Sequence, residues 1–98
     1  LNDHDFLQRS ISLAAAGRAF LTRLAGELGL RAYASGANFV LIDLHRDSMP
    51  VYQELLRRGV IVRPTASFGF PTCIRVTCGL AWQNERFAEA LRQVLVSD

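Results

Sequence analysis

The sequence predicts an α+β fold, a small open-faced α/β sandwich with its helices mainly on one face of a mostly antiparallel sheet. Three segments show apolar residues at helical spacing, and two short runs of β-formers lie between each successive pair of them. The resulting order is α-β-β-α-β-β-α, which suits a two-layer domain. Ninety-eight residues, half of them hydrophobic, suffice for one core. We therefore expect residues 1–98 to form a single domain.

The first expected element is a helix from about Asp3 to Leu28, and Gly29 follows as a C-terminal stop. Charged residues fall largely off its apolar stripe. That stripe, which we expect to be buried, comprises Leu7, Ile11, Ala14, Leu21, Leu24 and Leu28.

Two strands are expected next. The first lies at about Arg31–Ala34, and a turn at Ser35 and Gly36 precedes the second, residues 38–44 with the sequence NFVLIDL. This second segment is apolar on both faces, which is typical of a covered strand.

A second helix is expected to begin at Asp47 or Ser48 as N-cap, with Pro50 in its first turn, and to end at Gly59. Its predicted buried face comprises Val51, Leu55 and Leu56.

The last three elements are strands at about Val60–Arg63 and Ile74–Cys78 and a helix at about Gln83–Val96. The two strands are joined by a loop rich in Pro, Ser and Gly, which contains Phe68 and Phe70. The residues expected to be buried in the last helix are Phe87, Ala90, Leu91 and Val94.

Each of these two strands carries an arginine. Because side chains alternate along a strand, Arg75 lies on the face opposite Val76, and Arg63 on the face opposite Val62. If the valines face the helices, both arginines point to the other surface of the sheet. They are either solvated or salt-bridged residues, or planar forks arranged for bidentate contact with a carboxylate or phosphate.

Charge and hydropathy exclude several classes of protein. The net charge is +2 and the basic residues are dispersed, so no stripe for a nucleic-acid backbone is present. No apolar run approaches the roughly 20 residues that span a bilayer, and the first residues are too polar for a signal peptide. We expect a soluble, cytoplasmic protein with no nucleic-acid or membrane partner.

The two cysteines predict neither a disulfide nor a metal site. Cys73 and Cys78 are roughly 16 Å apart if the segment between them is extended. Further metal ligands are limited to His4 and His45, both distant in sequence. Two buried thiols are expected.

All eleven basic residues are arginines, so the chain contains no lysine. Schiff-base chemistry by a lysine side chain of this segment is therefore excluded. The chain also begins at Leu1 without an initiator methionine, and we expect a piece of a larger protein.

Four motifs follow one another along the chain: GRAFLTRLAGELG (17–29), ANFVL (37–41), GVIVRP (59–64), and CIRVTCG (73–79) followed by NERF (84–87). In this order they resemble the C-terminal small domain of fold-type I (class I/II) aminotransferases, enzymes that depend on pyridoxal phosphate. Among these, the histidinol-phosphate aminotransferases are most similar. The resemblance covers essentially the whole chain, including a long inter-domain helix.

The resemblance implies that Arg75 binds a substrate α-carboxylate and that Arg63 helps hold a substrate phosphate. Asn38, at the head of its strand, is a further candidate for contact with substrate or cofactor, although a turn-stabilising role is at least as common. The implied reaction moves an amino group between glutamate and imidazole-acetol phosphate in histidine biosynthesis. These small molecules and the large domain of the same enzyme are the implied partners, and the parent is implied to be a homodimer.

The resemblance places pyridoxal phosphate and its lysine in the parent's large domain, so no cofactor is expected on this segment and the segment alone is expected to be inactive. The alternative is a stand-alone α/β binding or regulatory module without catalysis. A cofactor lysine encoded upstream in the same reading frame would distinguish them.

Some residues depart from the family pattern or fit other sites. Leu80 and Gln83 replace a capping Thr and an acidic residue, so a neighbouring aromatic or cobalamin-pathway aminotransferase stays a possible assignment.

His45 follows a strand but lacks a nucleophile partner, and we expect it at the surface. Phe39, Phe68 and Phe70 are compatible with a base-stacking platform, but a helix-first order does not fit an RNA-binding sheet.

Overall fold

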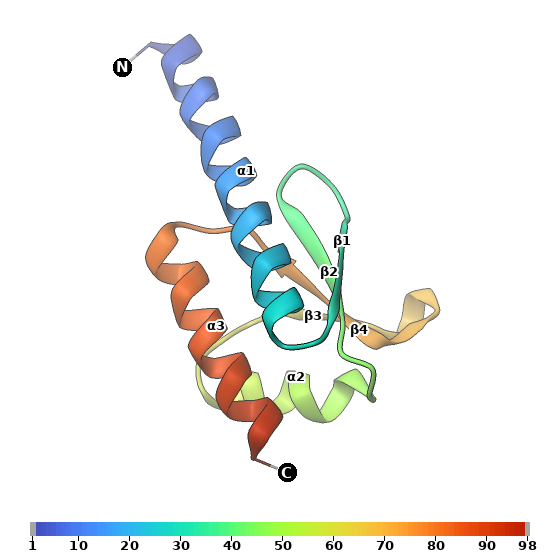
Figure 1. Cartoon of the computed structure of the whole chain (residues 1–98). Coiled ribbons are helices and arrows are strands. Elements are labelled where there is room, and N and C mark those ends of the chain that lie inside the picture. The colour runs from blue at the N-terminus through green and yellow to red at the C-terminus, as the bar shows by residue number, and fades with distance from the viewer. Residues whose placement is uncertain (1, 98) are drawn as a thin grey trace.

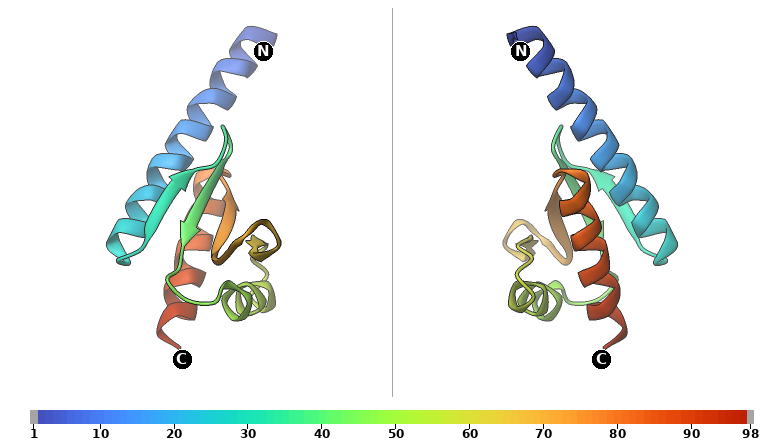
Figure 2. Two further views of the ribbon diagram at one scale, coloured as in Figure 1. Left: turned by 90° about the vertical axis from the view of Figure 1, so that its right-hand side faces the viewer. Right: turned by 90° about the vertical axis from the view of Figure 1, so that its left-hand side faces the viewer.

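The computed structural model describes residues 2–97 as one antiparallel sheet with three helices. The strands, in the order β1-β2-β4-β3 across the sheet, are β1 (Arg31–Ala34), β2 (Phe39–Asp43), β4 (Phe70–Thr77) and β3 (Arg63–Thr65). The helices are α1 (Asp3–Glu27), α2 (Ser48–Arg57) and α3 (Ala81–Val96), with a 3₁₀ turn at Ala66–Phe68. The helices lie on one side of the sheet (Figures 1 and 2), so the predicted fold class is confirmed.

The core lies between this sheet and the helices. Ile42 and Ile74 are register partners on the two central strands, and both are fully buried. Because side chains alternate between the two faces along both strands, one face supplies the core and the other carries side chains that the helices do not cover. All four residues predicted to be buried in α3 are buried: Phe87, Ala90, Leu91 and Val94.

The first two helices end next to the glycines that were predicted to stop them. Gly29 and Gly59 adopt φ values of +72° and +79°, and in each case the next residue donates back to the helix. Val60 N–H donates to the Leu55 carbonyl at 2.9 Å, and Leu30 N–H to the Ala25 carbonyl at 2.8 Å. With the bonds from the Gly29 and Gly59 N–H groups to the Gly26 and Leu56 carbonyls, at 3.2 and 3.0 Å, each helix end forms a Schellman motif, which satisfies carbonyls left over at a helix end.

The predicted strand at Val60–Arg63 was placed too early. Val60 is bound to the end of α2, and the β3 ladder begins only at Arg63. The alternation nevertheless holds, because Val62 is buried and Ile61 is 80% exposed.

The last strand and helix are longer than predicted. β4 begins at Phe70 instead of Ile74, so Phe70 is a strand residue and Phe68 lies in the 3₁₀ turn. α3 begins at Ala81, two residues before Gln83. Gln83 accepts a hydrogen bond from Leu80 N–H at 2.8 Å, which satisfies the helix start without a capping hydroxyl at Leu80.

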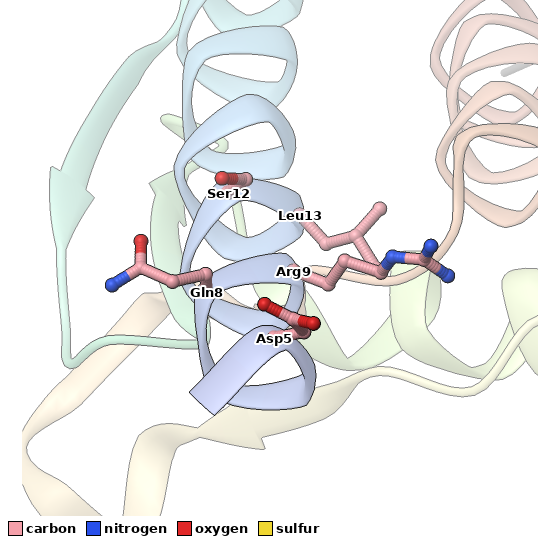
Figure 3. A pocket seen from close by; sticks show the side chains of 5 residues that line it. All are labelled: Asp5, Gln8, Arg9, Ser12 and Leu13. Atoms are coloured by element: carbon pink, nitrogen blue, oxygen red, sulfur yellow. The ribbon is translucent and has the colours of Figure 1, made fainter. Parts of the chain in front are cut away.

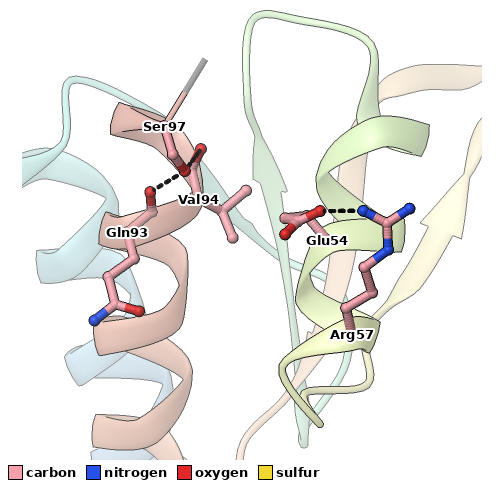
Figure 4. Close-up of polar contacts among 5 residues, drawn as sticks. All are labelled: Glu54, Arg57, Gln93, Val94 and Ser97. Atoms are coloured by element: carbon pink, nitrogen blue, oxygen red, sulfur yellow. Dashed lines mark hydrogen bonds and ion pairs between the residues drawn. The ribbon is translucent and has the colours of Figure 1, made fainter.

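The short helix α2 begins as predicted, with the Asp47 side chain accepting from Met49 N–H at 3.1 Å. Near the end of α2, Arg57 forms an ion pair with Glu54 at 2.8 Å (Figure 4). The neighbouring helix α3 ends at a hydrogen bond from the Ser97 hydroxyl to the Gln93 carbonyl, at 2.6 Å. The predicted buried face is correct for Val51 and Leu55 and wrong for Leu56, which is 45% exposed.

The N-terminal half of α1 extends beyond the rest of the domain (Figure 1). The expected burial of Leu7 and Ile11 is wrong: they are 56% and 53% exposed, and Ala14 is the first buried residue of the helix. The helical period was read correctly, but residues 2–97 provide no surface against this half of the stripe.

We expect the isolated chain to self-associate as its concentration rises, because Leu7, Ile11 and Leu13 expose apolar surface on the projecting half of α1. Sedimentation velocity over a concentration series is the measurement. The double replacement Leu7→Gln with Ile11→Gln should weaken the association without touching the core. A strictly monomeric chain at high concentration contradicts this expectation.

No helix within residues 2–97 is long and apolar enough to cross a membrane. Both cysteines are free thiols, with Cys73 buried and Cys78 partly buried. The expectation of two buried thiols is therefore correct for Cys73, whereas Cys78 is only partly buried.

Candidate functional site

Arg63 and Arg75 are direct register partners across the β3–β4 pair. Directly opposed residues of an antiparallel pair have Cβ atoms about 4.5–5.5 Å apart and project from the same face. Arg75 pairs on its other side with Leu41 of β2, and this row lies on the face opposite the buried Ile74 and Val76. The prediction that both arginines share the face away from the helices is confirmed.

Two like charges directly opposite each other destabilise a sheet unless an anion offsets them. Within residues 2–97, neither guanidinium forms an ion pair or hydrogen bond with an acceptor. Arg63 is exposed and Arg75 is half-buried. Both guanidinium groups therefore keep N–H donors that no acceptor in this part of the chain uses, which suits the binding of a carboxylate or phosphate.

Arg75 has one specific neighbour that sequence reasoning missed. Its Cζ lies 4.4 Å from the centroid of the Phe39 ring, well inside the range of a cation–π contact. Phe39 pairs with Thr77, so it is the diagonal neighbour of Arg75 on the same sheet face. Only the strand register brings these residues together, because they are far apart in the sequence.

The turn before β2 is held from two sides. Arg18 of α1 donates to the Ala37 carbonyl, and Cys78 N–H donates to the Asn38 carbonyl at 2.7 Å. Asn38 is exposed and lies in this turn, immediately before Phe39. The structure thus gives the Asn38 backbone a turn-stabilising contact.

A second polar cluster forms at the other end of β2. Asp43 Oδ1 accepts from the His45 N–H and from the Thr72 hydroxyl, both at 2.9 Å. The hydrogen bond from the His45 backbone, with a further one from Thr72, lowers the pKa of Asp43 below its ordinary value. His45 is exposed, as expected, and its backbone has φ +57°, which the bond to Asp43 stabilises.

The cysteines have no features of reactive thiols. Burial raises the pKa of Cys73 and of Cys78 above the ordinary thiol value. Among residues 2–97 no group of three or more His, Cys, Asp or Glu side chains is placed to hold a metal ion.

A hollow on α1 offers no comparable chemistry. It is lined by Asp5, Gln8, Arg9, Ser12 and Leu13, which all come from a single helix (Figure 3). Within residues 2–97 no second element lines this hollow, and it groups no side chains comparable to the arginine pair.

The model of the family described as aminotransferase class I and II matches residues 1–91. The chain belongs to this family. The match spans most of the chain, so the resemblance read from the four motifs is confirmed. Pyridoxal phosphate is the cofactor that this family implies for the parent enzyme.

Similar sequences within this family include several histidinol-phosphate aminotransferases. Histidinol-phosphate aminotransferase 2 of Pseudomonas aeruginosa is 50% identical over 98 residues, which are 100% of this chain and 27% of that protein. The Symbiobacterium thermophilum enzyme is 46% identical over 95 residues, 97% of this chain and 26% of that protein. The chain therefore spans about a quarter of the length of these relatives.

Solved structures of aminotransferases share the fold of this chain. Histidinol-phosphate aminotransferase from Sinorhizobium meliloti, in complex with pyridoxal-5'-phosphate, superimposes with a TM-score of 0.88 at 26% identity, covering 97% of this chain and 27% of that one. A variant of Thermus thermophilus aspartate aminotransferase gives a TM-score of 0.75 at 28% identity, covering 93% and 26%. The fold of this chain is thus found in aminotransferases of different named substrates.

These 98 residues lack the side chain to which pyridoxal phosphate is covalently attached. Covalent attachment of that cofactor requires a lysine, and this chain has none. A lysine that binds this cofactor in the parent enzyme therefore lies outside these 98 residues.

Proposed function

We propose that this chain is the C-terminal small domain of a histidinol-phosphate aminotransferase and that it anchors the anionic groups of the substrate. The observation that carries the proposal is the register pairing of Arg63 with Arg75, without an acceptor for either among residues 2–97. The relatives named histidinol-phosphate aminotransferase support the choice of substrate.

In this proposal Arg75 binds the α-carboxylate of the amino donor, glutamate. Its planar fork can donate two parallel N–H hydrogen bonds to the two carboxylate oxygens, and its partial burial strengthens those bonds relative to water. Holding the carboxylate fixes the orientation of the α-carbon, which is how a binding group accelerates a reaction that it does not perform.

Arg63 is the proposed anchor for the phosphate of imidazole-acetol phosphate or of histidinol phosphate. It is exposed beside Arg75, so a doubly charged group can contact both guanidinium groups at once. Asn38 remains a proposed additional contact. The remaining three quarters of a homodimeric parent, absent here, supply the cofactor and its lysine in this proposal.

The test is an activity assay of the full-length protein that contains this chain. It should transfer the amino group of glutamate to imidazole-acetol phosphate, measured as formation of histidinol phosphate and 2-oxoglutarate. Transfer to other keto acids with no preference for the phosphate-bearing substrate contradicts the specific assignment. Absence of any aminotransferase activity, together with no cofactor lysine upstream, contradicts the role in catalysis.

The isolated chain is expected to form no covalent adduct with pyridoxal phosphate at an internal side chain, because it has no lysine. The measurement is borohydride reduction of the mixture followed by peptide mass analysis. An adduct at the N-terminal amine serves as the internal positive control for the reduction. Robust aminotransferase turnover by this chain alone contradicts the proposed division of roles.

A further inference from the structure

We propose that Phe39 is a positioning residue for Arg75: its ring holds the plane of the guanidinium while the N–H edge stays free for a carboxylate. This inference rests on the role proposed above for Arg75. The Arg75 Cζ lies 4.4 Å from the ring centroid. Guanidinium groups stack on aromatic faces, and this contact uses the face of the group instead of its donors.

The alternative way to hold an arginine is an acidic partner, which would occupy the donors. Arg57 and Arg92 illustrate this, since each uses a guanidinium nitrogen on a glutamate, at 2.8 and 3.2 Å. Arg75 has no such partner within residues 2–97. A ring therefore orients the side chain without competing with an incoming anion.

The ring itself is held in place by the strand and by the turn before it. Val40, the next residue, is 1% exposed and anchors this end of β2 in the core. A Cβ built on Gly36 would lie 3.4 Å from Phe39 Cδ2, so the turn backbone passes close to the ring edge. Gly36 has φ +139°, which suits glycine, and Arg18 binds the adjoining Ala37 carbonyl. These contacts restrict the position of the Phe39 ring. The ring in turn restricts the orientation of the Arg75 side chain.

The same face of the sheet supplies a matched control. Arg31 Cζ lies 5.7 Å from the Tyr33 ring centroid, a second arginine–aromatic contact, but on the edge strand β1. Replacing the aromatic ring there changes a similar contact and leaves the surroundings of Arg75 intact. A general effect of losing an aromatic residue from this face would appear in both variants.

The experiment compares Phe39→Leu, Phe39→Tyr and Tyr33→Leu in the full-length enzyme, with steady-state kinetics over a range of glutamate concentrations. Phe39→Leu should raise the KM for glutamate about threefold to tenfold, since it removes the π face but keeps an apolar side chain. Phe39→Tyr keeps the face and should stay within about twofold of the parent enzyme, as should Tyr33→Leu.

A double-mutant cycle with Arg75→Ala separates positioning from a structural role. When Arg75 is absent, Phe39→Leu should cause no further rise in KM. A full additional loss in that background, an unchanged KM in Phe39→Leu alone, or no rescue by Phe39→Tyr overturns the inference about Phe39. If Arg75→Ala itself leaves the glutamate kinetics intact, it is the proposed function that fails, and the inference fails with it.

Discussion

Arg75→Ala in the full-length enzyme is expected to lower kcat/KM for glutamate about a hundredfold or more. Hydrogen bonds to a charged group in a partly desolvated site contribute about 1.5–3 kcal/mol, and misplacement of the substrate adds to that loss. Because every amino acid carries an α-carboxylate, the loss should extend to each amino-acid substrate tested. Steady-state kinetics with glutamate and with a second amino acid measure it.

Arg75→Lys is the matched variant for this prediction. Lysine keeps the positive charge but lacks the planar fork, and it cannot form the same pair of parallel hydrogen bonds. We expect it to restore little of the lost activity. Far-UV circular dichroism of both variants controls for folding. Full activity in Arg75→Ala contradicts both the substrate role of this residue and the assignment of the arginine pair as the site.

The sequence alone predicted those features that depend on local periodicity. Glycine after each of the first two helices, the Asp47 cap and the buried face of α3 follow from spacing and backbone chemistry. The face of Arg63 and Arg75 also followed, because side chains alternate in a strand whatever its partners are. These predictions needed no knowledge of which strands are neighbours.

The features that were missed depend on register or on surfaces far along the chain. The contact of Phe39 with Arg75 arises only because β2 pairs with β4, and the pairing of Arg63 with Arg75 only because β3 lies at the edge beside β4. Periodicity likewise shows an apolar stripe on α1 but not whether a partner covers it, and Leu7 is exposed here. A pattern of apolar residues thus predicts a face, and tertiary contacts decide its burial.

Arg63→Ala is the prediction that separates the specific assignment from the general one. It should lower kcat/KM for histidinol phosphate about 10- to 150-fold, the equivalent of losing a charge-assisted contact of about 1.5–3 kcal/mol. An aromatic amino acid of similar size, which has no phosphate, should be affected much less. Steady-state kinetics of both substrates with one enzyme preparation provide the comparison.

The Arg63→Ala experiment is interpreted from the ratio of the loss for histidinol phosphate to the loss for the aromatic amino acid. An equal loss for both substrates contradicts a phosphate role for Arg63, while the aminotransferase assignment, which rests on Arg75 and the family, remains. A selective loss instead indicates that the exposed member of the pair distinguishes a phosphate from other groups. Since Arg63 and Arg75 are direct register partners, with Cβ atoms about 4.5–5.5 Å apart, we expect a phosphate bound by one guanidinium to contact the other as well. The double variant should therefore lose less than the sum of the two single losses in free energy when histidinol phosphate is the substrate.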